Sequence, residues 1–378
     1  MTMFWIAVGL AVVPTGAQML SIALAWRRTT RPGVLAADSP HPPVSIVRPL
    51  CGVEAYEAET LASTFTLDYP DYEVILCVAQ PYDPVVALAR ATMARFPHVK
   101  SRLIIGDEAI SDNPKLNNVA RGWAGAAHEW IILADSNVLM PKDYIGRLLA
   151  RFDDKTGLVC ACPIGARPGN AAADLECAFL NSYQARWQYV ADALGRGFAQ
   201  GKTMCWRRGV LESAGGIKAL ASEPAEDAAA TKVVHARGMK VRLVAGPFEQ
   251  PLGSRALLAV WQRQVRWARL RRVTFPLFFV PEILSTGIWP MLLAGIASAL
   301  IGAAIVPPVL LVAVLWYGAE CLLSQAAGWP LTPRIVAAMV LRDVLLPLLW
   351  VDAWLGNDFV WRGHAMRAVA AHGPHDEP

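Results

Sequence analysis

Residues 68–78 read DYPDYEVILCV, a turn signal followed directly by an apolar strand pattern. Pro and Asp favour the turn, and the β-branched and aliphatic run after them is typical of a buried strand. Similar runs lie at 44–47, 102–105 and 130–134, and a fifth strand is expected at 158–162. Continuous apolar strands of this kind indicate a sheet that is covered on both faces.

Helical patterns fall between these strands, at about 54–66, 84–96, 115–126 and 141–152. Strands that alternate with helices of this length predict an α/β fold with a Rossmann-like, mostly parallel sheet. Ligands of such sheets bind beyond the carboxyl ends of the strands. The residues that follow each strand are therefore the first candidates for a functional site.

An uncharged stretch precedes this α/β region. Residues 4–26 are long enough to span a bilayer. Arg27, Arg28 and Arg31 follow at once, which predicts that the next domain lies in the cytoplasm, because basic residues accumulate on that side. A cleaved signal peptide is the alternative, but the stretch is long and lacks a basic segment at its start.

A second apolar region follows the α/β region. Residues 283–319 contain no charged side chain and suffice for two spans, with a break near Pro307. Residues 335–361 are apolar but carry four charges, which are costly at membrane depth. This segment is expected to lie in the interface, to re-enter, or to pair its charges inside a bundle, rather than to make a simple full span. The predicted domains are an anchor at 1–31, a catalytic domain at 32–254, interfacial amphipathic helices at 255–281, membrane helices at 282–361 and a tail at 362–378.

The composition excludes several classes of protein. With 54% hydrophobic and 17% charged residues, the chain is too apolar for an ordinary soluble protein of 378 residues. Its net charge of +4 comes without a nucleic-acid-binding motif, so no nucleic-acid partner is expected. The seven cysteines show neither metal-ligand spacing nor a disulfide framework, which indicates reduced thiols in a cytoplasmic domain.

Carboxylates occur at two positions where a ligand is expected. Asp135 and Asn137 follow the strand pattern at 130–134, where a carboxylate can hold a divalent cation with help from substrate phosphates; turn formation or helix capping is the alternative. Glu226 and Asp227 precede a helical pattern, so they also fit an acidic first turn stabilised by the helix dipole.

Other polar residues follow the remaining strands. Residues 113–118 read NPKLNN, and Lys115 and Asn118 at a helix start can meet a phosphate. Taken alone, a capped helix with exposed polar residues is the simpler explanation. Glu54 and Asp83 come after the first and second strands and would lie at the same sheet edge.

Residues 255–272 contain six arginines and no acidic residue, directly before the second apolar region. If this stretch is helical, Arg263, Arg266 and Trp267 share one face. Two guanidiniums on one face suit a diphosphate, because Arg donates in a planar fork. Attraction to anionic lipid is the alternative, and it is preferred for the arginines at 269, 271 and 272.

Taken together, these residues resemble the membrane-anchored family 2-type glycosyltransferases, and most closely the ceramide glucosyltransferases of family 21. The signature of that family is a series of aspartates followed by (Gln/Arg)-x-x-Arg-Trp. Asp135 matches the metal and nucleotide aspartate, and Asp227 matches the last aspartate. Arg263, Arg266 and Trp267 match the closing motif.

Further segments also resemble the family, namely 48–54, 67–74 and 113–118. Two features depart from it. Asn137 stands where many related enzymes carry a second aspartate, which puts the strength of the metal site in question. The family's first aspartate has no clear counterpart, and Asp83 is the nearest candidate.

The resemblance implies a GT-A domain in the cytoplasm that transfers a sugar, with inversion, from a UDP-sugar to the primary hydroxyl of ceramide. UDP-glucose is the expected donor. Asp227 would be the general base, Asp135 and Asn137 would hold Mg²⁺ or Mn²⁺, and Trp267 would line the acceptor site. The residues implied in nucleotide-sugar binding are Glu54, Asp83, Lys115, Asn118, Asp135, Glu226, Arg263 and Arg266.

Other functions fit parts of the pattern. The sugar acceptor could be another membrane lipid, such as a hopanoid or a polyisoprenoid, or a growing polysaccharide, although three or four spans are few for a polysaccharide channel. A transporter or an inactive membrane scaffold is the rival outside the enzymes. The uncharged stretch 283–319 opposes transport, and the presence of both Asp227 and Arg266 opposes an inactive scaffold.

Overall fold

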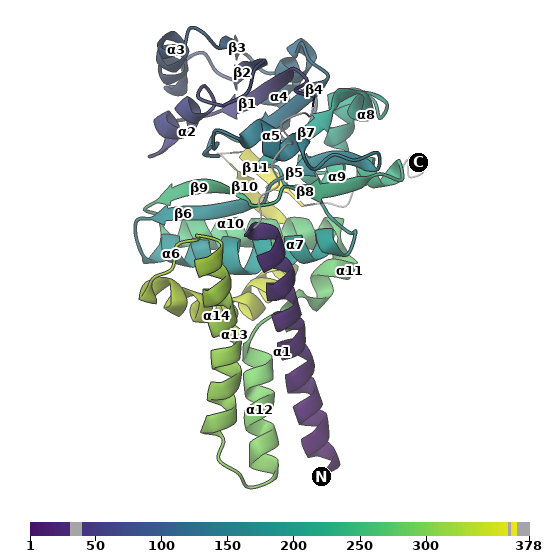
Figure 1. Cartoon of the computed structure of the whole chain (residues 1–378), viewed down its shortest axis with the longest axis vertical. Coiled ribbons are helices and arrows are strands. Elements are labelled where there is room, and N and C mark those ends of the chain that lie inside the picture. Colours follow the sequence, from purple (N-terminus) through teal and green to yellow (C-terminus); the bar gives the residue numbers. More distant parts are fainter. Residues whose placement is uncertain (31–39, 362–363, 369–378) are drawn as a thin grey trace. The chain divides into compact units, whose positions relative to one another are not determined.

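The computed structural model describes residues 1–30, 40–361 and 364–368 (Figure 1). These residues form two compact units. The helical unit comprises Met1–Thr30, Gly165–Val190 and Ser254–Asn357, and the sheet unit comprises the rest. Gly165–Val190 belongs to the helical unit, although it lies inside the range predicted for the catalytic domain. Arg31 and most of the predicted tail lie outside the described residues.

The sheet unit is built on seven strands in the order β3-β2-β1-β4-β7-β5-β8. The first four strands in this order are parallel, as predicted. β7 was not predicted; it runs antiparallel to both β4 and β5, whereas β8 is parallel to β5. The strands are β1 (Val44–Leu50), β2 (Tyr72–Val78), β3 (Lys100–Ile105), β4 (Trp130–Ala134), β5 (Thr156–Cys160), β7 (Thr203–Arg207) and β8 (Lys240–Leu243).

Helices connect these strands, as the alternating pattern predicted. α4 packs so closely on the sheet that a Cβ atom at Gly122 would lie 2.6 Å from atoms of both Cys77 and Val47. Only glycine allows this approach. The helices are α2 (Glu57–Ser63), α3 (Val85–Arg95), α4 (Pro114–Gly125), α5 (Tyr144–Leu149), α8 (Arg208–Glu212), the 3-10 helix η2 (Gly216–Ser222) and α9 (Glu226–Ala236).

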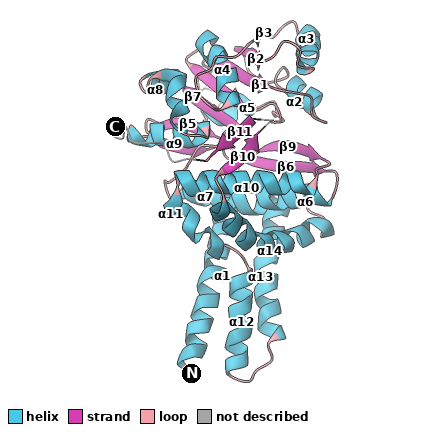
Figure 2. Ribbon diagram, turned by 180° about the vertical axis from the view of Figure 1, so that it is seen from behind, coloured by secondary structure: helices cyan, strands magenta, loops and turns pink. Residues whose placement is uncertain are grey.

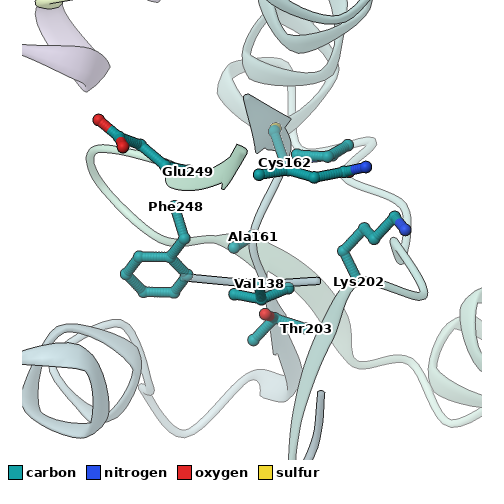
Figure 3. Close-up of a pocket in the computed structure, with 9 residues that line it drawn as sticks. Val138, Ala161, Cys162, Lys202, Thr203, Phe248 and Glu249 are labelled. Atoms are coloured by element: carbon teal, nitrogen blue, oxygen red, sulfur yellow. The ribbon is translucent and has the colours of Figure 1, made fainter. Parts of the chain in front are cut away.

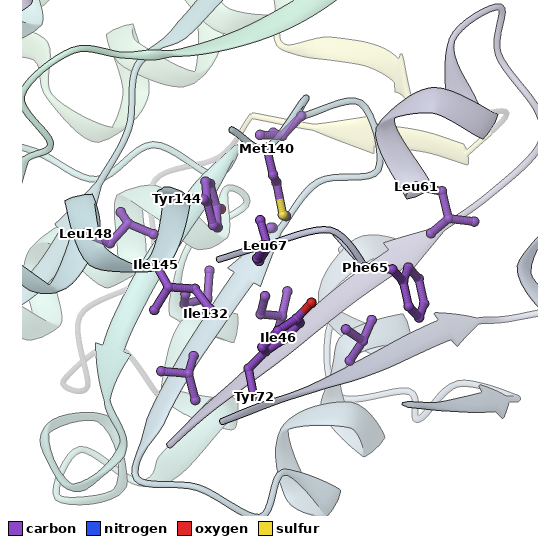
Figure 4. Packing of buried hydrophobic residues seen from close by; sticks show 14 of the residues in the cluster. Ile46, Leu61, Phe65, Leu67, Tyr72, Ile132, Met140, Tyr144, Ile145 and Leu148 are labelled. Atoms are coloured by element: carbon purple, nitrogen blue, oxygen red, sulfur yellow. The ribbon is translucent and has the colours of Figure 1, made fainter. Parts of the chain in front are cut away.

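The core of the sheet unit lies where α2 and α5 meet the central strands. Figure 4 shows Ile46 and Ile132 of the sheet together with Leu61, Phe65 and Tyr144 from the connecting segments. All five side chains are buried. This packing holds the strand ends in place. Short pairs of strands complete the described chain: β6 (Pro163–Pro168) with β9 (Phe248–Gly253), and β10 (Asp358–Trp361) with β11 (His364–Arg367).

The helical unit contains three long helices that lie side by side, α1, α12 and α13 (Figure 2). A continuous helical segment, α6–η1–α7, includes one stretch of π-helix, and α10 and α14 pack together. The elements are α1 (Thr2–Thr29), α6 (Ala171–Ala178), the π-helix η1 (Phe179–Ala185), α7 (Arg186–Ala193), α10 (Leu257–Thr274), α11 (Pro276–Phe279), the 3-10 helix η3 (Val280–Leu284), α12 (Ile288–Leu300), α13 (Val306–Ala326) and α14 (Pro333–Leu355).

Two of the described helices, α1 and α13, are long and apolar enough to cross a membrane. α12 gives a third span if it is counted with Pro276–Leu284, from which it is bent by 43°. The break predicted near Pro307 is confirmed, because α12 ends at Leu300 and α13 begins at Val306. α14 is not among the candidate spans.

The charges of α14 are paired inside the helical unit, which was one of the predicted alternatives. Arg342 donates to Glu320 of α13 at 3.0 and 3.1 Å and to its neighbour Asp343 at 2.7 and 2.9 Å. Arg186 lies 3.9 Å from Glu320, and Gln18 of α1 donates to the same carboxylate at 3.0 Å. We call Arg186, Glu320, Arg342 and Asp343 the buried arginine cluster. All four are 0% exposed.

Candidate active site

The carboxyl ends of β2, β1 and β4 meet at one edge of the sheet. Asp135 leaves β4 at this edge. Lys202 enters β7, which runs antiparallel to β4, so the two residues are adjacent in space. The backbone N–H of Asp135 donates to the carbonyl of Lys202 at 3.0 Å. The direction of β7 thus adds a second loop to the edge at which ligands of such sheets bind.

Lys115 lies at the centre of the site. Its Nζ is 2.6 Å from Asp135 Oδ1, 2.6 Å from Glu226 Oε1 and 2.6 Å from the carbonyl of Gly201. Asn113 caps α4 by accepting from the backbone N–H of Lys115 at 2.9 Å, and its side-chain amide donates to Glu226 at 2.8 Å. An ammonium has three donors, so these three oxygens satisfy Lys115 completely.

Asp135 is held by two lysines. Its second oxygen, Oδ2, is 2.9 Å from Lys202 Nζ, which also donates to Asn137 Oδ1 at 3.1 Å. Burial would raise the pKa of Asp135, but Lys115 and Lys202 outweigh it and keep the pKa well below its ordinary value. We call Lys115, Asp135, Lys202 and Glu226 the carboxylate–lysine cluster.

Asp227 lies in the first turn of α9, beside this cluster. Its carboxylate accepts from the backbone N–H groups of Gly201 at 3.1 Å and Ala228 at 2.8 Å. Burial, followed by the negative charge of Glu226, raises the pKa of Asp227 to about 6, although Lys115 opposes the shift. A carboxylate with a pKa near neutrality suits a general base.

Gly201 joins the cluster to Asp227, because its carbonyl accepts from Lys115 and its N–H donates to Asp227. A Cβ atom at this position would lie 2.7 Å from Glu226 Oε1 and 3.1 Å from Lys115 Nζ. Any side chain here would therefore enter the site. The sequence analysis missed both Gly201 and Lys202, because neither follows a predicted strand or belongs to a recognised motif.

Arg48 fixes the loop that carries Asp135. Its fully buried guanidinium donates to the carbonyls of Asp135 at 2.9 Å, Ser136 at 2.6 Å and Val138 at 3.2 Å, and to that of Thr60 at 2.7 Å. Burial lowers the pKa of Arg48 to about 10. This side chain therefore positions the loop after β4.

The other predicted residues of the sheet unit lie along the same edge. Asp83 accepts from the backbone N–H of Gly52 at 3.0 Å with each of its oxygens, which joins the loop after β2 to the loop after β1. The Asn118 amide donates to carbonyls of β1 and β2 at 3.3 and 3.0 Å, so its NH₂ group supports the sheet. Glu54 is exposed in the loop after β1.

The predicted arginine face lies on α10 of the helical unit. Arg263, Arg266 and Trp267 are all half-buried. Arg263 forms a very short contact with Glu176 of α6, a fully buried carboxylate that also has Arg255 at 3.7 Å. Glu176 was not identified from the sequence. The buried residues of this helix are Val260, Gln264, Val265, Ala268 and Thr274.

The described residues contain no group of three or more His, Cys, Asp or Glu side chains that could hold a metal ion. The oxygens of Asp135 and Asn137 nevertheless converge on one positive charge, the ammonium of Lys202. This donor set fits a divalent cation that takes most of its ligands from phosphate and water, as Mg²⁺ commonly does.

A narrow hollow borders Lys202 (Figure 3). It has no room for a water molecule. A ligand can therefore enter this hollow only if one of the side chains that line it moves. Its lining includes Val138, Cys162, Lys202, Thr203, Phe248 and Glu249.

The sequence is similar to those of known proteins. Ceramide glucosyltransferase 3 of Caenorhabditis elegans is 24% identical over 351 residues, which are 91% of this chain and 76% of that protein. A ceramide glucosyltransferase of Komagataella phaffii is 27% identical over 61% of this chain and 56% of its own length. A mannosyltransferase of Pyrobaculum calidifontis, solved with GDP-Man and Mn²⁺, has a TM-score of 0.49 and 14% identity, with 92% of this chain and 98% of that chain covered.

The profile of glycosyl transferase family 21 matches residues 6–372, almost the whole chain. This match confirms the resemblance that the sequence motifs indicated. The mostly parallel sheet, with the antiparallel β7 beside β4, agrees with the GT-A fold expected for such an enzyme. The chain belongs to glycosyl transferase family 21.

Proposed function

We propose that this protein transfers a sugar, with inversion, from a UDP-sugar to the primary hydroxyl of ceramide, and that UDP-glucose is the donor. Family membership and the similarity to ceramide glucosyltransferases support this proposal. The observation that carries the chemistry is Asp227, a carboxylate with a pKa of about 6 that lies beside a cation position at the carboxyl edge of the sheet.

In the proposed reaction Asp227 is the base. Its carboxylate takes the proton of the ceramide hydroxyl as that oxygen bonds to the anomeric carbon. The bond between the anomeric carbon and the phosphate oxygen breaks in the same step, and UDP leaves with the electron pair. One displacement inverts the centre, so no covalent sugar–enzyme intermediate is needed.

Asp135 and Asn137 would hold Mg²⁺ or Mn²⁺, which when bound neutralises negative charge on the diphosphate. Lys115 keeps Asp135 charged and fixes its orientation. Through Gly201 the same lysine is tied to Asp227, so that base and cation position are held in one network. Preorganisation of this kind lowers the reorganisation needed during reaction.

The remaining predicted residues keep their proposed roles. Glu54, Asp83, Asn118 and Glu226 would belong to the nucleotide-sugar site. Arg263 and Arg266 would add positive charge for the leaving UDP. Trp267 would line the path of the lipid acceptor.

The direct test uses purified protein, a panel of UDP-sugars, and ceramide, a hopanoid or a polyisoprenoid as acceptor. Mass spectrometry of the lipid product should detect hexosylceramide, formed with UDP-glucose in preference to the UDP derivatives of galactose, glucuronic acid and N-acetylglucosamine. Glycosylation of another lipid with none of ceramide would replace the acceptor in this proposal. NMR of the product would identify the anomeric configuration.

The sheet unit is proposed to face the cytoplasm. The support is the pair Arg27 and Arg28 in the last turn of α1, directly after an apolar span. Single cysteines introduced at exposed positions such as Lys100 should react with a membrane-impermeant thiol reagent only after the membrane is opened. Labelling in sealed, right-side-out membranes would contradict this orientation.

A further inference from the structure

Two lysines converge on Asp135, but their surroundings differ. Lys115 is surrounded by three oxygens and belongs to the fixed frame of the site. Lys202 instead bridges one oxygen of Asp135, at 2.9 Å, and the side-chain oxygen of Asn137, at 3.1 Å. Lys202 therefore takes the two oxygens that the proposed metal would use.

A metal ion bound to both of these oxygens would lie between them, where the ammonium of Lys202 lies now. Mg²⁺ binds its ligands at ~2.0–2.1 Å, well inside the distances at which Lys202 now lies from the same atoms. The other oxygen of Asp135 is already engaged by Lys115 at 2.6 Å. Metal binding therefore requires Lys202 to move away.

We propose that the ammonium of Lys202 occupies the metal position in the donor-free protein and is displaced when metal and nucleotide bind together. This inference rests on the proposed function, and it names the residue that controls the binding of metal and nucleotide at that site.

The charge balance explains why metal alone should bind weakly. Asp135 and Glu226 are balanced by the ammoniums of Lys115 and Lys202, so the cluster carries no net charge. Asp227 beside the cluster adds at most one negative charge, so a divalent ion added alone brings at least one uncompensated positive charge next to two lysines. A nucleoside diphosphate brings negative charge with the metal and gives the displaced ammonium phosphate oxygens to contact.

Lysine is suited to such an exchange. Its charge sits on a flexible four-carbon stem, and its ammonium makes no fixed planar fork. The side chain of Lys202 is 18% exposed, so that it has access to solvent. When it moves, the cation position changes occupant while Lys115 keeps Asp135 in place.

The test is calorimetric titration of Mn²⁺ into the full-length protein in detergent, with and without UDP. Lys202→Met removes the ammonium, and Lys202→Gln does so while keeping a polar end. Without UDP both variants should bind Mn²⁺ roughly tenfold more tightly than wild type, because a positive charge next to the ligand oxygens is gone. The enhancement of Mn²⁺ affinity by UDP should shrink by a similar factor.

Lys100→Met is the matched control, since Lys100 is 73% exposed and pairs only with the exposed Asp71 at 3.2 Å in the described contacts. It should leave Mn²⁺ affinity unchanged. Unaltered Mn²⁺ affinity in folded Lys202 variants, or no Mn²⁺ binding by any form, would overturn the proposal. Failure of the proposed function would appear separately, as no sugar on ceramide, because the titration needs neither sugar nor acceptor.

Discussion

The sheet unit and the helical unit each hold two cations and two carboxylates in close contact, but the cations differ in kind and in exposure. The carboxylate–lysine cluster uses Lys115 and Lys202, whose side chains are 13% and 18% exposed. The buried arginine cluster uses Arg186 and Arg342, which are 0% exposed. Similar charge counts thus occur in an accessible site and in a sealed one.

The difference between arginine and lysine matches what each cluster does. Arg342 donates to two carboxylates and a serine in a fixed planar geometry, which suits a permanent link between helices. Lysines at an accessible strand edge can give up their partners to a metal or a phosphate. Burial makes the buried arginine cluster costly to break, whereas exposure allows the carboxylate–lysine cluster to exchange its partners.

The largest effect is expected where the sheet cluster meets the base. Asp227→Asn keeps the shape of the side chain but cannot accept the hydroxyl proton, so transfer should fall by ~10²–10⁴-fold. UDP binding, measured by calorimetry, should change little. Turnover close to wild type would exclude Asp227 as the base.

The buried arginine cluster can be tested by removing one of its cations. Arg342→Met would leave Glu320 and Asp343 buried without their main partner, and loss of one member of a buried pair costs about 3–5 kcal/mol. Thermal unfolding in detergent should shift strongly downward. Arg367→Met, which removes an exposed arginine 3.4 Å from the exposed Asp358, is the control and should unfold like wild type. Equal shifts in the two variants would mean that the buried cluster is not stabilising.

Gly201→Ala tests how tightly the sheet cluster is packed around its lysine. The new Cβ atom would lie 2.7 Å from Glu226 Oε1 and 3.1 Å from Lys115 Nζ, so one or both of these side chains must shift. Displacement of a side chain near the reacting group can lower turnover by ~10²-fold. Steady-state kinetics should show a lower kcat with an unchanged melting temperature, and an unchanged kcat would indicate that the loop tolerates the methyl group.

The pH dependence of transfer should also distinguish the two clusters, because only the carboxylate–lysine cluster lies beside the proposed base. The base works in its charged form, and the pKa of Asp227 is raised to about 6. Transfer should therefore be constant above this pH and fall as the pH decreases through 6, by ~tenfold per unit below it. An acid limb near the ordinary value of 3.8 in the kcat/KM profile would contradict this assignment.

The smallest effect is expected when a metal ligand is strengthened rather than removed. Asn137→Asp adds a second carboxylate at the cation position and should tighten Mn²⁺ binding by about tenfold without UDP. Asp135→Ala should remove that binding, and EDTA should stop transfer by the wild type. Full activity in EDTA would mean that lysines and arginines neutralise the diphosphate without a metal.

Much of the architecture is predictable from sequence, because hydrophobic periodicity is a local property. The first four parallel strands, the helices between them, the N-terminal span and the break near Pro307 all follow from runs of neighbouring residues. Asp135 and Asp227 also follow from the sequence, since one ends a strand and both match a family motif. Their roles as ligand and base stay predictions.

Tertiary structure alone decided which partners these residues meet. Lys202 and Gly201 reach the site only because β7 inserts antiparallel beside β4, and pairing between distant strands leaves no local pattern. Glu176 and Glu320 find their arginines in the same way, across different helices. A buried charge without a partner is costly. The charges of α14 were therefore unexpected in an apolar segment of the sequence. Only the packing of the helices showed which residues pair with them.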